Sequence, residues 1–213
     1  DLGDNKEPEV IVPPVTAPAP TVTIAKQVTV KVRSIETTSG NLVVQFDATD
    51  EDGYGFVGIG DGTLRFNVAK LIPGSNGDAS QWQNYVNRVK DQREAFPNSG
   101  VATQATNEKN GTDEGQGKLI DNNDGSYRYT FVTDVLNAVD PVSGELIPWE
   151  DKLTHRIATE IRKTDNNPAA NAIYDWVPAG DAVTHTRDIV AIESCNNCHT
   201  QLKMHGGNRI DTA

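Results

Sequence analysis

Sulfur-containing residues are scarce in this chain of 213 residues, which has only two cysteines and one methionine. Two cysteines are too few for the disulfide framework of a small secreted domain. The chain also has no run of eighteen apolar residues, so the sequence predicts no transmembrane helix. No charged and then apolar leader stands at its start, and we expect that any signal peptide has been removed.

Basic residues are also in deficit. There are 19 of them against 30 acidic residues, which gives a formal net charge of -11 at pH 7. A nucleic-acid-binding protein needs a basic face to replace the counterions of the phosphates, so this composition argues against one. It favours a soluble or extracellular surface that meets cations, cationic partners or minerals, and plain solubility explains it equally well.

Prolines are concentrated at the amino terminus. Residues 1–21 are acidic and Pro-rich, and such a sequence sustains neither a helix nor a β-ladder. We interpret them as an extended tether, with a frayed terminus as the alternative. Residues 22–187 are predicted to form a mainly β domain, either a split β-barrel or a Greek-key sandwich, because short alternating segments are separated by polar, Gly-rich turns. The expected strands include 22–32, 42–46, 64–72, 155–161 and 188–192.

The clearest hairpin signal is the stretch 117–132. Its Asp124-Gly125 pair is typical of a tight turn, and Tyr127, Tyr129 and Phe131 would share one face of a strand. One segment departs from the β pattern. Residues 80–96 have apolar residues at helical spacing, so we predict an inserted helix there. The polar stretch 98–116 that follows is expected to be a long mobile loop.

Both cysteines lie in the sequence Cys195-Asn196-Asn197-Cys198-His199. In Cys-x-x-Cys-His, the attachment motif of c-type haem, one helical turn offers both sulfurs to the two haem vinyl groups. Each thiol adds across a vinyl group to form a thioether, and the histidine provides the proximal axial ligand of the iron. We therefore predict one covalent haem c in residues 188–213, with Cys195, Cys198 and His199 as the attachment and proximal residues. Attachment of this kind takes place outside an energy-conserving membrane, so we expect an exported protein.

Two other chemistries share part of this motif. A structural zinc site needs four ligands, and the sequence has no second cysteine pair. A thioredoxin-like thiol pair lies in a βαβ unit and does not require the histidine. Nothing before Cys195 resembles such a unit, so haem is the preferred interpretation.

The distal axial ligand is open at this point. His205 is the first candidate, provided that the chain does not continue as a helix past His199; His185 is the second and His155 the third. The single methionine, Met204, lies too close to His199 in sequence to reach the opposite face of the haem easily. Gly206-Gly207 would let the chain turn after His205, which favours that residue slightly.

A resemblance extends this interpretation. The Cys-x-x-Cys-His motif is followed by Leu202-x-x-His205-Gly206-Gly207-x-Arg209, and this combination resembles the first haem site of the outer-membrane multihaem cytochromes of metal-reducing bacteria, the OmcA/MtrC family. The segments 71–74 and 121–127, together with Trp82, resemble the amino-terminal β domain of that family. The acidic, Pro-rich start is similar to the stretch that follows a lipidated cysteine there.

The resemblance implies a split β-barrel packed against the haem region and a low-spin haem with two histidine ligands. It also implies a location on the outer surface of a Gram-negative bacterium, with an N-terminal lipid anchor as the link to the membrane. The parent protein would pass electrons through further haems to metal oxides or flavins. Family members carry about ten haems and this chain has one motif, so we expect a fragment of a longer cytochrome, with a natural single-haem protein as the alternative.

Electron transfer is thus the first functional hypothesis, and the chain is not expected to be an enzyme in its own right. A β module that docks an acceptor or a partner, with the haem at its boundary, is the second. An open-site haem enzyme is the third. Calcium is a weaker cofactor candidate, at the oxygen-rich loops 50–53 and 121–125, although turn residues alone explain both loops.

Overall fold

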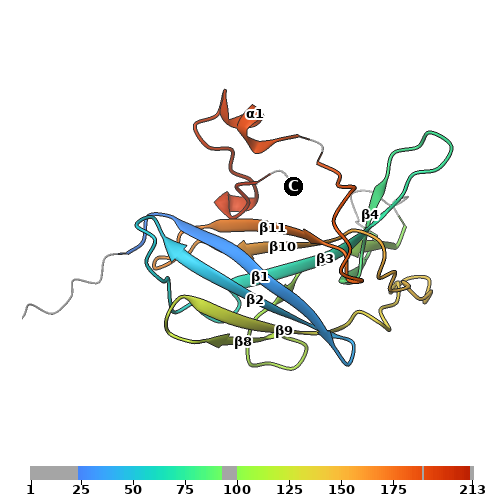
Figure 1. Ribbon diagram of the computed structural model, residues 1–213, viewed down its shortest axis with the longest axis horizontal. Helices are drawn as coiled ribbons and strands as arrows, with labels where there is room; N and C mark the ends of the chain where they lie inside the picture. Colours follow the sequence, from blue (N-terminus) through green and yellow to red (C-terminus); the bar gives the residue numbers. More distant parts are fainter. Residues whose placement is uncertain (1–23, 93–99, 189, 212–213) are drawn as a thin grey trace, which may run out of the picture.

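The computed structural model describes residues 24–92, 100–188 and 190–211 of the chain. Figure 1 shows two larger β-sheets, with the carboxyl-terminal segment lying over the outer face of one of them. The predicted tether, residues 1–21, lies outside the described residues. Within the described ranges, no helix has the length and apolar character that crossing a membrane requires.

The first sheet has the strand order β1-β2-β9-β8. Its strands are β1 (Val28–Thr38), β2 (Asn41–Asp50), β9 (Ser126–Asp134) and β8 (Lys118–Asp121). All neighbouring pairs are antiparallel, and buried residues alternate with less buried ones along the first half of β1 and along β9. The predicted hairpin is confirmed as β8–β9. Asn123 and Gly125 take the positive φ values of its turn, 61° and 87°.

The second sheet has the order β11-β10-β3-β4, with β7 also paired to β3. Its strands are β11 (Ala170–Trp176), β10 (His155–Ile161), β3 (Leu64–Ile72), β4 (Gln81–Asn84) and β7 (Glu108–Lys109). A separate two-stranded ribbon joins β5 (Asn87–Lys90) and β6 (Ala102–Ala105). Strand β11 has a weak alternation and was not foreseen from the sequence.

The core lies between the two sheets and is rich in aromatic rings. Phe46 of β2 stacks on Tyr127 of β9 at 5.1 Å between ring centroids, and its edge meets Phe66 of β3 at 5.9 Å. Phe66 also packs on Tyr129 at 4.6 Å. These rings are almost completely buried, and each such side chain contributes about 2 kcal/mol by leaving water. The prediction of a mainly β domain is confirmed. Among the described strands, no pairing closes the sheets into a hydrogen-bonded barrel.

The helix predicted over 80–96 is wrong. Residues 81–84 and 87–90 are strands β4 and β5, and between them Tyr85 and Val86 are both buried at a corner of the chain. The helical spacing of the apolar residues comes from this change of direction. Strand β3 needs partners for its free edge, and this tertiary requirement outweighs the local pattern. Residues 93–96 lie outside the described residues.

Two further predictions are wrong. The stretch 98–116 is not one long loop, because β6 and β7 lie within it. Nor do residues 188–192 form a strand, since the chain there runs irregularly and Ile192 begins the short helix α1 (Ile192–Asn196). Residues 98, 99 and 189 lie outside the described part. A single 3₁₀ turn, η1 (His205–Gly207), follows α1.

Candidate haem-binding segment

The two cysteines and the neighbouring histidine lie on one continuous turn that begins in α1. The amide of Cys198 donates to the carbonyl oxygen of Cys195 at 3.2 Å, and the amide of His199 donates to the same oxygen at 3.1 Å. Both cysteines are free thiols; Cys195 is half-buried and Cys198 is exposed. The sequence-predicted attachment residues are therefore brought together on one turn.

Helix α1 stands apart from the β core. None of its residues is buried, and Figure 1 shows it raised above β10 and β11. After His199 the chain turns back, where the amide of Leu202 donates to Oδ1 of Asn196 at 2.7 Å. The sulfurs and the imidazole of His199 are thus presented outside the domain, where a large planar group can reach them. These residues fit a covalently attached haem.

The segment before α1 is fixed to the outer face of the second sheet by residues 185–188, here called the first anchor. The hydroxyl of Thr154 donates to the carbonyl oxygen of His185 at 2.8 Å. The guanidinium of Arg156 on β10 donates to Oδ1 of Asp188 at 2.8 Å, and it also makes two hydrogen bonds, of 2.7 and 2.8 Å, to the carboxylate of Asp175. It lies 4.6 Å from the ring centroid of Trp82, in cation–π geometry.

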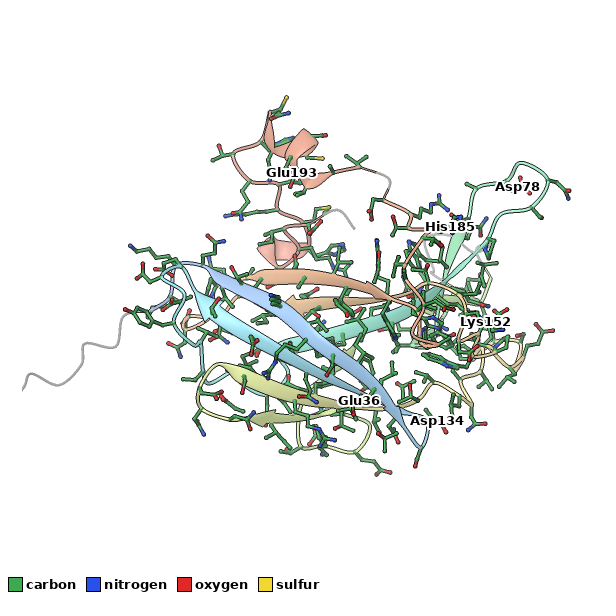
Figure 2. The ribbon with its side chains drawn as sticks, viewed as in Figure 1. Glu36, Asp78, Asp134, Lys152, His185 and Glu193 are labelled. Carbon is green, nitrogen blue, oxygen red and sulfur yellow. The ribbon has the colours of Figure 1, made fainter. Side chains whose placement is uncertain are left out.

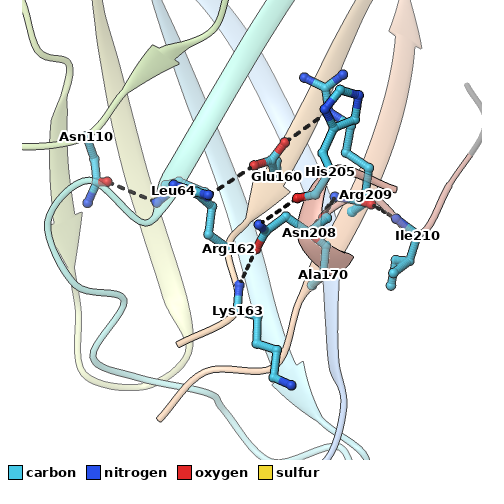
Figure 3. Close-up of polar contacts among 11 residues, drawn as sticks. Leu64, Asn110, Glu160, Arg162, Lys163, Ala170, His205, Asn208, Arg209 and Ile210 are labelled. Carbon is cyan, nitrogen blue, oxygen red and sulfur yellow. Dashed lines mark hydrogen bonds and ion pairs between the residues drawn. The ribbon is translucent and has the colours of Figure 1, made fainter. Parts of the chain in front are cut away.

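The segment after α1 is fixed by residues 208–210, the second anchor. Asn171 of β11 donates to the carbonyl oxygen of Asn208 at 3.2 Å and accepts from the amide of Ile210 at 2.7 Å, so its side chain pairs with the backbone as a neighbouring strand would. Arg209 forms an ion pair with Glu160 of β10 at 3.2 Å. Figure 3 shows this cluster at the end of the β10–β11 hairpin.

Strand β10 therefore supports both anchors. Arg156 and Glu160 lie on the same face of the strand, four residues and about 13 Å apart. Between them is a trough of about 340 Å³, floored by Ala158 of β10 and Ala69 of β3. The candidate haem-binding segment, residues 188–211, leaves the sheet at one end of this trough and returns at the other. The resemblance had drawn attention to Arg209 and Trp82, but sequence reasoning missed their partners Arg156, Glu160 and Asn171, because none of these belongs to a recognisable motif.

His205 has an unusual backbone conformation. Its φ is 50°, in the left-handed region that residues with a Cβ rarely adopt. His205 can be the distal ligand only if no helix continues past His199. The chain is indeed not helical between His199 and His205, and Met204 is extended with φ -119° and ψ 164°. The His205 side chain is exposed.

The other histidines have different surroundings. His185 is exposed, its Nδ1 lies 2.9 Å from the Thr184 hydroxyl, and Figure 2 shows it towards the β4 end of the sheet, separated in this view from Glu193 on α1. His155 is fully buried in the core, where Nδ1 and Nε2 lie at hydrogen-bond distance from Leu153 and Tyr85. With both ring nitrogens engaged, His155 is a structural residue and not a haem ligand in this fold.

In the oxygen-rich loops 50–53 and 121–125, carboxylates accept hydrogen bonds from backbone amides and so stabilise turns. Asp50 accepts hydrogen bonds from the amides of Asp52 and Tyr54, and Asp121 accepts from the amides of Asn123 and Gly58. This is the geometry of Asx turns. In the described part of the chain, no three His, Cys, Asp or Glu side chains are grouped so that they could hold a metal ion.

Comparison with known proteins identifies the family to which this chain belongs. A family model described as the OmcA-like N-terminal domain matches residues 29–183. The chain belongs to this family. A curated relative, the multiheme cytochrome MtrC of Shewanella baltica (strain OS185), is 31% identical in an alignment of 181 residues that covers 80% of this chain and 24% of the relative.

Two solved structures are similar to this chain. The outer membrane decaheme cytochrome OmcA superposes with a TM-score of 0.70 at 30% identity, over 86% of this chain and 28% of OmcA. MtrC from Shewanella baltica OS185 gives 0.63 at 29% identity, over 87% and 28%. The chain therefore spans about a quarter of the length of the relatives it matches.

Proposed function

We propose that this OmcA-like domain carries one haem c, bound by thioethers to Cys195 and Cys198, with His199 as the proximal and His205 as the distal iron ligand. It acts as an electron-transfer module of an extracellular multihaem cytochrome. The observation that carries the proposal is the presentation of two free thiols and one imidazole on a single exposed turn, held between two anchors on β10.

The domain's relatives support the cellular setting. Relatives named as a multiheme cytochrome and as an outer membrane decaheme cytochrome match most of this chain. By this analogy the haem exchanges electrons with further haems of a parent chain at the outer surface of a Gram-negative cell, and from there with metal oxides or flavins. The haem supplies the one-electron chemistry; the protein's share is to attach it, orient its ligands and set its exposure.

Three properties of the residues favour His205 as the distal ligand over His185. His205 follows the attachment turn directly, on a non-helical connection, and its backbone is held in a disfavoured conformation. His185 is fixed at the first anchor through its own carbonyl oxygen. A residue held in strain at the edge of a site is a reasonable candidate for a functional role.

The test starts with haem attachment. The full chain is produced in cells that contain a c-type cytochrome maturation system, and its mass and pyridine haemochrome spectrum are measured. We expect one haem per chain, attached through two thioethers. Cys195→Ala and Cys198→Ala should each show the spectrum of a single thioether, whereas Asn197→Ala, which changes an exposed residue between them, should match the parent. A chain that retains no haem after denaturation would refute the attachment.

The ligands are then tested by electron paramagnetic resonance of the oxidised protein. The parent and His185→Ala should be low-spin, and His205→Ala should be high-spin. Conversion to high spin by His185→Ala instead would move the distal ligand to that residue. Electron transfer itself is measured by stopped-flow reoxidation of the reduced chain with a soluble ferric chelate and with a flavin. A reduced haem that neither acceptor reoxidises would contradict the electron-transfer role.

A further inference from the structure

The backbone around His205 takes a conformation that needs support. His205, Gly206 and Gly207 have successive positive φ values of 50°, 72° and 85°. The two glycines adopt this region freely, but a histidine does not. The turn is closed at its base by two backbone hydrogen bonds between Met204 and Arg209, at 2.8 and 3.2 Å.

The side chain of Asn208 supplies the missing support. Its Nδ2 donates to the carbonyl oxygen of His205 at 3.1 Å, and its Oδ1 accepts from the backbone amide of Lys163, just beyond β10, at 2.9 Å. Asn208 is 8% exposed, so its side chain is buried and both hydrogen bonds are partly buried. A single amide thus connects the backbone of His205 to the β domain, as Figure 3 shows.

The chemistry of this link requires asparagine. A carboxylate accepts from the Lys163 amide but has no donor for the His205 carbonyl, and alanine makes neither bond. The backbone that follows the side chain is fixed separately by Asn171, through the carbonyl oxygen of Asn208 and the amide of Ile210. The position of Asn208 along the sheet is therefore already determined when its side chain turns to His205.

The hydrogen bond to His205 adds nothing to docking. The ion pair of Arg209 with Glu160, the Asn171 pairing and the Lys163 contact all join the segment to the β domain. The bond from Asn208 to His205, in contrast, joins two residues of the same segment. Its effect is to fix the orientation of the His205 peptide, and with it the direction in which the imidazole leaves the backbone.

From these contacts we infer that Asn208 is a positioning residue for His205, and that through it the β domain sets the orientation of an axial ligand of the haem. This inference rests on the proposed function, in which His205 is that ligand. It assigns the β domain a role in the properties of the haem, because ligand orientation affects both the spin state and the reduction potential.

The experiment compares Asn208→Ala, Asn208→Asp and Asn166→Ala in the haem-loaded chain. Asn166 is an exposed asparagine in the β10–β11 connection. Haem content should be equal in all three variants. The ratio of high-spin to low-spin haem should rise about fivefold in Asn208→Ala, the factor expected for loss of one neutral hydrogen bond. Asn166→Ala should match the parent.

Asn208→Asp separates orientation from docking, because aspartate retains the acceptor for Lys163 and loses the donor for His205. We expect it to have the spin-state ratio and the shifted reduction potential of Asn208→Ala. It keeps the Lys163 contact, but its thermal stability should fall below the parent's because its second carboxylate oxygen faces the carbonyl oxygen of His205. An Asp variant with the parent's spectrum and potential would overturn the inference and leave Asn208 a docking residue. Failure of the proposed function would give a different result: no covalent haem, or a low-spin spectrum that persists in His205→Ala.

Discussion

The phenol oxygen of Tyr85 lies 3.1 Å from Nε2 of His155, and the two rings are stacked within 7° of parallel. Nδ1 of His155 lies 2.9 Å from the carbonyl oxygen of Leu153. Because a carbonyl oxygen can only accept, Nδ1 carries the proton and Nε2 accepts from the phenol. Burial, followed by the nearby charge of Lys70, lowers the pKa of His155 to about 4, and burial also raises the pKa of Tyr85. The folded core therefore contains a neutral tyrosine–histidine pair.

This pair predicts an acid-sensitive stability. In the unfolded chain the pKa of a histidine is about 6.5, and in the fold the pKa of His155 is about 4. Between these values the unfolded chain binds a proton that the folded chain does not, so the free energy of unfolding falls as the pH falls from 6.5 towards 4. The loss attributable to His155 should be about 3 kcal/mol. Urea unfolding followed by circular dichroism at several pH values measures it.

The matched variants are His155→Gln and His185→Gln. Glutamine at 155 can still accept from Tyr85 but does not titrate, so the fall between pH 6.5 and 4 should become shallower. His185 is exposed, and its replacement should leave the pH profile unchanged. Identical profiles for His155→Gln and the parent would show that His155 is protonated in the folded protein.

Gly55 lies close to the β8–β9 turn, and this predicts that a side chain at position 55 would destabilise the fold. A Cβ at Gly55 would lie 2.2 Å from the carbonyl oxygen of Asp124, which is backbone and cannot move aside. Gly55→Ala should therefore lower the free energy of unfolding by about 2 to 4 kcal/mol, the range typical of severe local clashes. At Gly60 the nearest atom to an added Cβ is 4.0 Å away, so Gly60→Ala is the control. Equal midpoints of urea unfolding would contradict the prediction.

The buried carboxylate of Glu108 on β7 predicts a further position at which a substitution lowers stability. Glu108 is 5% exposed, and its oxygens accept from the Tyr129 hydroxyl at 3.0 Å and from the backbone amides of Val132 and Thr133 at 2.8 and 2.9 Å. Glutamine has only one acceptor oxygen and would direct an NH₂ group at a backbone amide. Glu108→Gln should cost about 1 to 3 kcal/mol of stability, and the exposed Glu114→Gln should be neutral. A neutral Glu108→Gln would mean that water or a rotated side chain replaces these bonds.

Glu108 also illustrates where sequence reasoning succeeded and failed. The long strands were predictable because their alternation runs over nine or more residues, and the β8–β9 hairpin because Asp124-Gly125 is a specific turn signal. Strands β6 and β7 were not, since four and two residues are too few for a periodicity to emerge. From the sequence alone, a glutamate in a polar stretch is assigned to a loop; its burial depends on three partner residues that all come from β9.

The candidate site divides in the same way. The proposed attachment residues follow from a five-residue motif whose chemistry is local, so the sequence alone was enough to predict Cys195, Cys198 and His199. The supports of that motif are 30 or more residues away along the chain: Asn171 meets Asn208 across 37 positions, and Glu160 meets Arg209 across 49. Such pairings depend on the sheet order, which no local pattern reveals. The Gly206-Gly207 pair was the only local sign of a special turn there.

The two carboxylates on Arg156 allow a final prediction about the first anchor. Asp175 makes two hydrogen bonds to the guanidinium, which raise the pKa of Arg156, and its side chain is 15% exposed; that of Asp188 is 58% exposed. Because the strength of an ion pair falls with exposure, Asp175→Asn should destabilise the fold by about 2 to 3 kcal/mol. Asp188→Asn should cost less than about 1 kcal/mol.

Asp188→Asn should instead loosen the haem-binding segment. The first anchor loses its charged contact while β10 and β11 remain intact, so proteolysis between residues 190 and 203 should become faster without a change in the unfolding midpoint. Asp175→Asn should lower the midpoint, because Arg156 is mostly buried and would lose its less exposed carboxylate partner while keeping the exposed Asp188. The same midpoint and the same cleavage rate in the two variants would contradict this prediction. Both carboxylates would then stabilise only the sheet, and the second anchor would hold the attachment turn.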